Sequence, residues 1–467
     1  MKKALLYIGL VLLLISCSNN AVHEKLFSAT NSNSSNLITN YAELRDFFSD
    51  TNQETEGYVA NDITLEVGEQ IEINSNIDKT LYLNGHTIKS PSILFSLGST
   101  KSSGNITICN VKDESRSYQN GVIESGVPIY FYGNNDNYTV TIKDIDLISN
   151  ESSSAIVLNN IKDVILENLT VIVDNPKTYQ IQGIYLTNSS SQKIDNVNVS
   201  INLTSDINNL TSKCKIHGIL AEGVNTQIKE LTNSSVKINT NNSYVYKLSD
   251  VIGMELINVD LIKNCRVNIN NESNDNIKAD NIYGVKLCNG LSMNSIYINI
   301  GKVGSFNEGS VVGLYAFGNN SELGINGSFE NVYVTMNLPQ GSQSSTFEIN
   351  KISGISINNV YDDQANLDNS NTNKYYVNKI SGKVDISKES NCKKLIGVEY
   401  RATKGTVDLR NLEISIDNKA NEFYKLYGIA LDLSNEATAN TDESKITYSV
   451  NNPTLNNKCH KITNTPE

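Results

Sequence analysis

The sequence lacks the features that mark several common functional classes. Its 467 residues carry a formal net charge of −12 and no basic patch, which argues against nucleic acid or an anionic lipid face as a partner. No Cys-x-x-Cys pair and no Cys/His cluster has the spacing of a metal site, so we expect no metal and no cofactor. No segment between the strand-like runs has a helical period. No apolar run reaches the ~20 residues that a membrane helix needs.

The N-terminus carries an export signal. Lys2 and Lys3 precede an apolar run over residues 4–15, which ends in Leu14-Ile-Ser-Cys17. This ending resembles the lipobox of bacterial lipoproteins, and the resemblance implies cleavage after residue 16 and acylation of Cys17. We therefore expect a signal peptide over residues 1–16, a flexible Ser/Asn-rich tether over residues 17–37, and a lipid-anchored protein at the outer membrane or cell surface. An ordinary signal peptide with an incidental cysteine is the alternative.

One pattern recurs along most of the chain: a polar residue, usually Asn, followed by apolar residues at the first, third and fifth positions after it. The clearest copies begin at Asn168, Asn196, Asn264, Asn331 and Asn411, and weaker ones at Asp78, Asp144, Asn233, Ser295, Ser381 and Glu443. From Asp144 onward the steps between copies are 24 to 50 residues long. This loose period indicates a solenoid of stacked coils.

A glycine opens a second apolar alternation upstream of each copy. These glycines are Gly183, Gly218, Gly253, Gly284, Gly313, Gly354, Gly397 and Gly428, and Ala155 fills the same slot. Period-2 alternation predicts a strand with one buried face, and we expect Gly to fit a sharp corner ahead of it. Two or three strands per unit predict a right-handed parallel β-helix of about 11–12 coils over residues 38–450, followed by a polar tail over residues 451–467.

Asn at one corner of each coil has a physical reason. A carboxamide carries both donors and acceptors, so stacked Asn side chains can satisfy the backbone of the turn and one another. We therefore expect a structural ladder of Asn168, Asn196, Asn233, Asn264, Asn331 and Asn411. The alternative is that Asn is simply abundant in this chain.

The entry into this region resembles the pectate-lyase-like β-helix superfamily. Asn40-Tyr-Ala-Glu43 has capping-box spacing, with Tyr41, Leu44 and Phe47 on one helical face. Strand-like runs over residues 63–67, 71–73 and 81–88 follow it. The resemblance, which covers roughly residues 38 to 450, implies a short helix that plugs the open end of the coil stack. A leucine-rich-repeat-like solenoid is the alternative, since residues 194–202 and 329–337 also fit that consensus.

Few residues are candidates for catalysis. If the residues two and four positions after each Gly point outward, Glu222 and Glu255 lie on adjacent coils with His217 near them, and Lys286 beside Glu255 suggests a surface ion pair. The resemblance implies motifs of polygalacturonases or pectate lyases, but the sequence has neither the polygalacturonase motif order nor the acidic cluster with an Arg base. We therefore expect a binding protein, with a polysaccharide lyase or glycoside hydrolase as the alternative.

The variable stretches fall mostly between an Asn-led strand and the next Gly-led strand, which places them on one side of the rod. Exposed Tyr can stack on sugars or anchor a protein. The candidates for a binding face are Tyr185, Tyr244, Tyr246, Tyr283 and Tyr315. We expect adhesion to, or binding of, glycans or host or envelope proteins. One alternative is that the loops vary in sequence without any binding role. Another is that the protein is a purely structural coat protein.

Cysteine usage leaves the redox question open. After Cys17 is assigned to lipid, six cysteines remain, which allow fifteen disulfide pairings in an exported protein. Cys265 falls on an inward strand position, where burial as a small apolar residue explains it without a bridge.

Overall fold

The computed structural model describes residues 36–464, apart from 100, 112–118, 134–137, 151, 175, 204–213, 241–247, 271–278, 303–308, 319–324, 339–348, 359–374, 390–391, 420–422, 443 and 451–458. The expected signal peptide, Cys17 and nearly all of the tether lie outside the described residues, as do Tyr244 and Tyr246.

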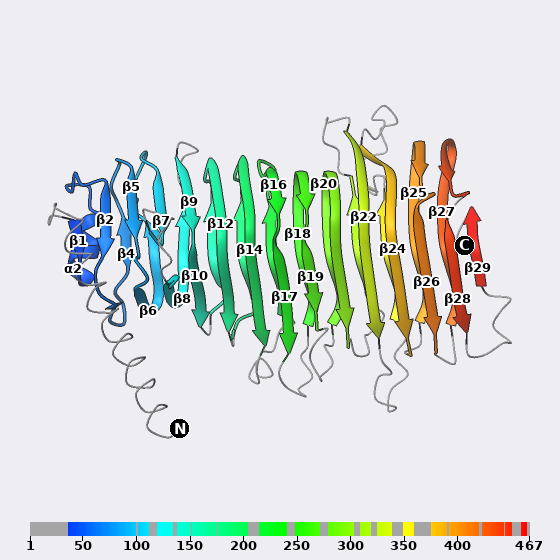
Figure 1. The fold of residues 1–467 in the computed structure, drawn as a ribbon, viewed down its shortest axis with the longest axis horizontal. Helices are drawn as coiled ribbons and strands as arrows, with labels where there is room; N and C mark the ends of the chain where they lie inside the picture. Colours follow the sequence, from blue (N-terminus) through cyan, green and yellow to red (C-terminus); the bar gives the residue numbers. More distant parts are fainter. Residues whose placement is uncertain are drawn as a thin grey trace, which may run out of the picture.

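The described chain forms one helix and a long series of parallel strands stacked into a rod (Figure 1). The helix is α2 (Tyr41–Phe47). The strands are β1 (Leu37–Ile38), β2 (Glu56–Val59), β3 (Ile63–Thr64), β4 (Ile71–Ile73), β5 (Lys79–Tyr82), β6 (Thr87–Leu97), β7 (Ile106–Cys109), β8 (Gly121–Tyr132), β9 (Thr139–Lys143), β10 (Ile145–Asn150), β11 (Ser154–Asn159), β12 (Asp163–Asp174), β13 (Gln180–Thr187), β14 (Ser191–Leu203), β15 (Cys214–Glu222), β16 (Ile228–Thr232), β17 (Ser235–Thr240), β18 (Leu248–Lys263), β19 (Arg266–Ile269), β20 (Ala279–Gly301), β21 (Ser310–Phe317), β22 (Ile325–Leu338), β23 (Ile349–Asn358), β24 (Tyr375–Lys388), β25 (Cys392–Asp408), β26 (Leu412–Asn418), β27 (Phe423–Asn440), β28 (Lys445–Val450) and β29 (Cys459–Asn464).

Strand pairing divides the rod into parallel stacks. The stack that contains the glycines, here called the Gly-led sheet, runs β4, β6, β8, β11, β13, β15, β18, β20, β21, β23, β25, β27 and β29. The stack that follows the Asn corner, the Asn-led sheet, includes β10, β12, β14, β17, β19, β20, β22, β24, β26 and β28. A third stack precedes that corner and includes β5, β7, β9, β12, β14, β16 and β18. This confirms the right-handed parallel β-helix. The leucine-rich-repeat alternative is wrong, because α2 is the one helix of the described residues.

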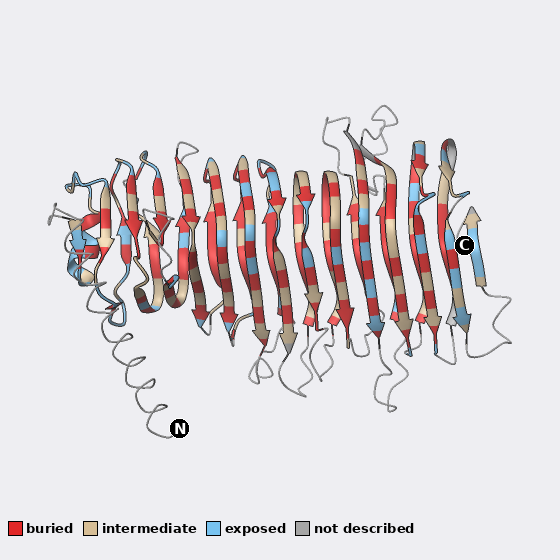
Figure 2. Ribbon diagram, viewed as in Figure 1, coloured by how far each residue is buried: buried red, intermediate tan, exposed pale blue. Residues whose placement is uncertain are grey.

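The apolar alternation builds a continuous interior. In β12, Leu169, Val171 and Val173 are buried, whereas Thr170 and Ile172 are half-exposed on the outside. The same red and pale banding repeats along the rod (Figure 2). One connected core therefore extends from the helix to the last rungs, as expected when each coil buries its apolar face against its neighbours.

The glycines have a different role from the expected sharp corner. They lie inside strands of the Gly-led sheet, and none of the eight has a positive φ. A Cβ on Gly218 would lie 2.1 Å from Val236 Cγ1 and 2.5 Å from the Gly253 carbonyl oxygen. The other seven make equivalent approaches to an interior Val or Ile and to the next rung. Glycine is needed here for close packing, since a side chain of the facing sheet fills the space.

The two ends of the rod differ (Figure 1). At the N-terminal end, Asn40 caps α2 by accepting a hydrogen bond from the Glu43 amide, and Leu44 and Phe47 are buried against the first coil. At the other end, residues 459–464, which the sequence places in the polar tail, form β29 and pair with β27. Ile462 of β29 is 43% exposed on this last rung.

Candidate functional site

The catalytic candidates lie on the outer face of the Gly-led sheet. His217 of β15 is 7% exposed, and its Nε2 lies 3.0 Å from Glu255 Oε2 of β18. On the next rung, Lys286 Nζ of β20 lies 2.6 Å from Glu255 Oε1. The Glu255 carboxylate therefore bridges two neighbouring rungs, with one oxygen for each partner. The ion pair that the sequence suggests between Lys286 and Glu255 is present.

The charge state of Glu255 follows from these contacts. Burial by itself would raise the pKa of Glu255, but the hydrogen bonds from His217 and Lys286 outweigh it and lower the pKa to about 2. A carboxyl group that stays ionised at neutral pH cannot act as a general acid. The ionised Glu255 is therefore suited to stabilising the contacts between β15, β18 and β20.

The second candidate carboxylate is directed away from the first. Glu222 is exposed at the end of β15, and its Oε1 accepts a hydrogen bond of 2.8 Å from the Tyr185 hydroxyl of β13. Burial, followed by this hydrogen bond, raises the pKa of Tyr185 to about 12. Glu222 therefore bonds to the rung before its own, whereas Glu255 bonds to β15 and β20. The two carboxylates do not share a partner or a proton.

Aromatic side chains continue along the same face. The rings of Tyr283 and Tyr315 lie 5.9 Å apart on adjacent rungs, and Phe317 stacks on Tyr315 at 5.4 Å. Near the N-terminal end of this sheet, Tyr130 and Tyr132 are 36% and 55% exposed. Tyr185, Tyr283 and Tyr315 are each half-buried. The face thus combines aromatic rings with paired charges.

A further ion pair on this face was missed by the sequence analysis. Lys351 of β23 contacts Glu399 of β25, and the Ser356 hydroxyl donates to Glu399 Oε2 at 2.6 Å. Burial opposes ionisation of Glu399, but Lys351 and Ser356 still lower its pKa. Outward-facing positions lie before each glycine as well as after it. Lys351 occupies one of them, three residues before Gly354 and in register with Lys394 of the next rung.

The Asn residues form hydrogen bonds between coils, but in separate runs. Asn168 Nδ2 donates to Asp144 Oδ1 at 2.8 Å, and Asn196 Nδ2 donates to Asn168 Oδ1 at 2.9 Å. Asn264 donates in the same way to Asn233 at 3.2 Å. Asn233 instead donates to Asp195, and Asn331 donates to Asn294. Each of these acceptors stands one residue before the ladder position of its own coil.

Backbone conformation explains the choice of Asn. Asn168, Asn196, Asn233, Asn264 and Asn331 have φ between 50° and 55°, in the left-handed region that Asn tolerates better than most residues. Asn411 has no positive φ. Its carbonyl accepts a hydrogen bond from Gly382, which stands next to Ser381 in the ladder register.

A second row of left-handed residues follows the Gly-led strands and was also missed. It contains Asn160, Asn188, Asn258 and Asn289, with Gly223 in the same row. Asn289 Nδ2 donates to Asn258 Oδ1 at 3.0 Å. The sequence could have predicted this row, because each of its members lies five residues after one of the glycines of the Gly-led sheet or after Ala155.

Other features bear on the candidate chemistry. Within the described ranges, no three His, Cys, Asp or Glu side chains form a cluster that could hold a metal ion. No disulfide joins the cysteines from Cys109 to Cys459, and Cys265 is fully buried at its inward position. Of the helices in the part of the chain that the structure describes, none has the length and apolar character to cross a bilayer.

No protein-family description matches the chain, and comparison with curated proteins and with solved structures finds no similar protein. Function must therefore be inferred from the geometry of this molecule.

Proposed function

We propose that this protein is an exported, lipid-anchored β-helix of the outer membrane or cell surface, and that it binds glycan chains or protein partners along the outer face of the Gly-led sheet. The lipobox-like Leu14-Ile-Ser-Cys17 supports the anchor, and the coil stack with its helical plug supports placement near the pectate-lyase-like superfamily. The acidic net charge supports partners other than nucleic acid.

One observation carries the binding role. The outer face of the Gly-led sheet presents aromatic rings, Tyr283, Tyr315 and Phe317, directly beside charged groups that are already neutralised by partners. Rings that are half-buried lose little conformational freedom when a sugar or a protein packs on them. Satisfied ion pairs give hydrogen-bonding groups in fixed positions, which suits recognition.

An enzyme is the second candidate, because His217 and Glu255 are hydrogen-bonded on the face that carries the aromatic rings. The low pKa of Glu255 and the separation of Glu222 from it count against a polysaccharide lyase or glycoside hydrolase that uses this pair.

Binding can be tested with a glycan panel and the Cys17→Ser protein, which removes the lipid but keeps the whole mature body. Tyr283→Ala and Tyr315→Ala should each weaken retention of the bound glycan, by about tenfold if the ring is a stacking platform. Tyr58→Ala, on β2 of another stack, is the control. Retention that is equal in all three variants would place the binding site elsewhere. Labelling with a radioactive fatty acid, lost in Cys17→Ser, tests the anchor.

A further inference from the structure

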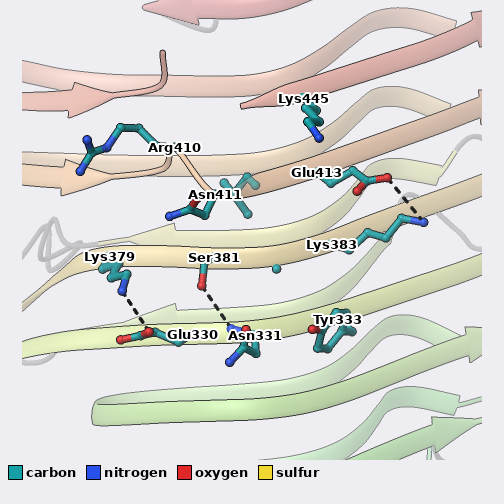
Figure 3. Close-up of a pocket in the computed structure, with 12 residues that line it drawn as sticks. Glu330, Asn331, Tyr333, Lys379, Ser381, Lys383, Arg410, Asn411, Glu413 and Lys445 are labelled. Atoms are coloured by element: carbon teal, nitrogen blue, oxygen red, sulfur yellow. Dashed lines mark hydrogen bonds and ion pairs between the residues drawn. The ribbon is translucent and has the colours of Figure 1, made fainter. Parts of the chain in front are cut away.

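The outer surface of the Asn-led sheet contains a hollow of about 720 Å³ at the rung of Gly382 (Figure 3). It is lined by Glu330, Asn331 and Tyr333 of β22, Lys379, Ser381, Gly382 and Lys383 of β24, Arg410 and Asn411 before β26, Leu412 and Glu413 of β26, and Lys445 of β28. It lies on a different sheet from the proposed glycan-binding face.

The hollow has a cause in the strand register. Phe329 pairs with Ile380 and Val332 with Gly382, so two residues of β22 face Ser381 alone. On the other side, Lys379 pairs with Asp408 and Gly382 with Leu412, so this neighbour also has one residue more. The rung of β24 is therefore one residue short at the Asn corner. Gly382 has a φ of 133°, and a Cβ there would lie 2.1 Å from the Val332 carbonyl oxygen, so only glycine fits beside this corner.

One wall of the hollow is an aromatic ring. Tyr333 stacks on Tyr297, with centroids 4.9 Å apart and planes 9° apart, and the Arg266 guanidinium lies 5.5 Å from the Tyr297 ring on the preceding rung. One face of Tyr333 is thus covered. The neighbour on the other side is Lys383, which extends toward Asp385 and Glu413. Tyr333 is 36% exposed and lines the hollow, where a further ring can pack against it.

The polar lining favours a ligand with one negative charge. Four cationic side chains line the hollow, and one of them, Lys383, pairs with Asp385 at 3.0 Å and with Glu413 at 3.8 Å. Lys379 pairs with Glu330 at 2.9 Å, and Arg410 pairs with Asp408 at 2.9 Å. Within the described residues, Lys445 forms no ion pair; it is exposed and lies in register with Glu413 of the neighbouring strand. The amides of Asn331 and Asn411 lie on opposite sides of Ser381, at the corner where β24 is one residue short (Figure 3).

We propose that this hollow binds a pyranose sugar that bears one anionic group, a carboxylate or a sulfate ester. The apolar face of the ring packs on Tyr333, the hydroxyls bond to the amides of Asn331 and Asn411, and the anionic group pairs with Lys445. The site stands on its own geometry and does not depend on binding at the Gly-led sheet.

Saturation-transfer NMR and titration with three probes test the site: methyl glucuronide, methyl glucoside 6-sulfate and methyl glucoside. We expect millimolar binding of one or both anionic probes and weaker binding of the neutral one. Which anionic probe binds distinguishes carboxylate from sulfate. Tyr333→Ala should lower affinity about tenfold, whereas Tyr333→Phe, which keeps the ring face, should preserve it. Lys445→Gln should lower affinity for the anionic probe to that of the neutral one.

Matched controls are Tyr58→Ala, whose ring stacks on Tyr82 as Tyr333 stacks on Tyr297, and Lys162→Gln, an exposed lysine just before β12. Neither should change the affinity. The proposal is overturned if no probe binds, if the neutral sugar binds as tightly as the anionic ones, or if Tyr333→Ala or Lys445→Gln leaves affinity unchanged. Loss of sugar binding in Tyr315→Ala but not in Tyr333→Ala would support the Gly-led face and exclude the hollow.

Discussion

Val199 Cγ1 lies 2.2 Å from the point that a Cβ on Gly183 would occupy, so the side chain of one sheet packs directly on the backbone of another. Gly183→Ala must displace Val199 and also the Gly218 carbonyl, 2.6 Å away. We expect a loss of about 1–3 kcal/mol in the free energy of unfolding, the usual cost of overpacking. Urea unfolding of Gly183→Ala, Val199→Ala and the double variant measures it. The two changes should be less than additive; strict additivity would show that the two residues are not in contact.

The left-handed corner gives a second prediction. Asn196 combines φ of 51° with a hydrogen bond to Asn168, so Asn196→Ala loses both the bond and the tolerance for that conformation. We expect a loss of about 1–2 kcal/mol, and a smaller loss for Asn196→Gly, which keeps the backbone freedom. Asn411→Ala is the control, because Asn411 has no positive φ. A larger loss for Gly than for Ala would contradict the conformational explanation.

The Glu255 network predicts a dependence of stability on pH. Because the pKa of Glu255 is lowered in the folded state, its contribution is present above about pH 4.5 and is lost as the pH falls toward about 2. Glu255→Gln should unfold at a lower temperature at neutral pH, and its midpoint should fall less steeply than that of the unchanged protein between these two pH values. Thermal scans across this range, with exposed Glu72→Gln as the control, provide the measurement. Parallel curves for Glu255→Gln and the unchanged protein would rule out the network.

The cysteines should behave as buried thiols. Burial raises the pKa of Cys109 and Cys214 to about 12 and that of Cys265 to about 11, so few thiolates are available for reaction. Cys459, which is partly exposed on β29, should be the first to react with a thiol reagent in the Cys17→Ser protein. The five buried cysteines should react only on unfolding, and a reductant should leave the unfolding temperature unchanged. A drop in that temperature with reductant would indicate a disulfide.

The sequence predicts the solenoid well because its information is local. Each strand carries its own alternation, as Leu169, Val171 and Val173 show, and the Asn corner repeats often enough to set the coil. The contacts on the outer faces depend on register between rungs that are 24 to 50 residues apart, which the sequence predicts only at positions counted forward from each glycine, as for Glu255 and Lys286. For this reason the Lys351 and Glu399 pair, and the way Glu222 turns to Tyr185, appear only in the structure.

The hollow illustrates a signal that was present but small. In the regular copies two residues separate the last inward residue before the corner from the first one after it, as between Phe329 and Val332. Between Ile380 and Gly382 there is only Ser381. A shortening by one residue is easily lost among coils of variable length. As a result β24 has one residue fewer at this corner than the strands on either side of it, which becomes visible only when the strands are paired.

Glycan binding without cleavage, on the outer face of the Gly-led sheet, is the central property of the proposed function. The direct measurement is to incubate the Cys17→Ser protein with the oligosaccharide that it retains most strongly and to follow chain length by mass spectrometry. We predict that the oligosaccharide is recovered at its original length, in amounts that fall in Tyr315→Ala. The appearance of shorter chains with new reducing or unsaturated ends, abolished in Glu255→Gln, would contradict it.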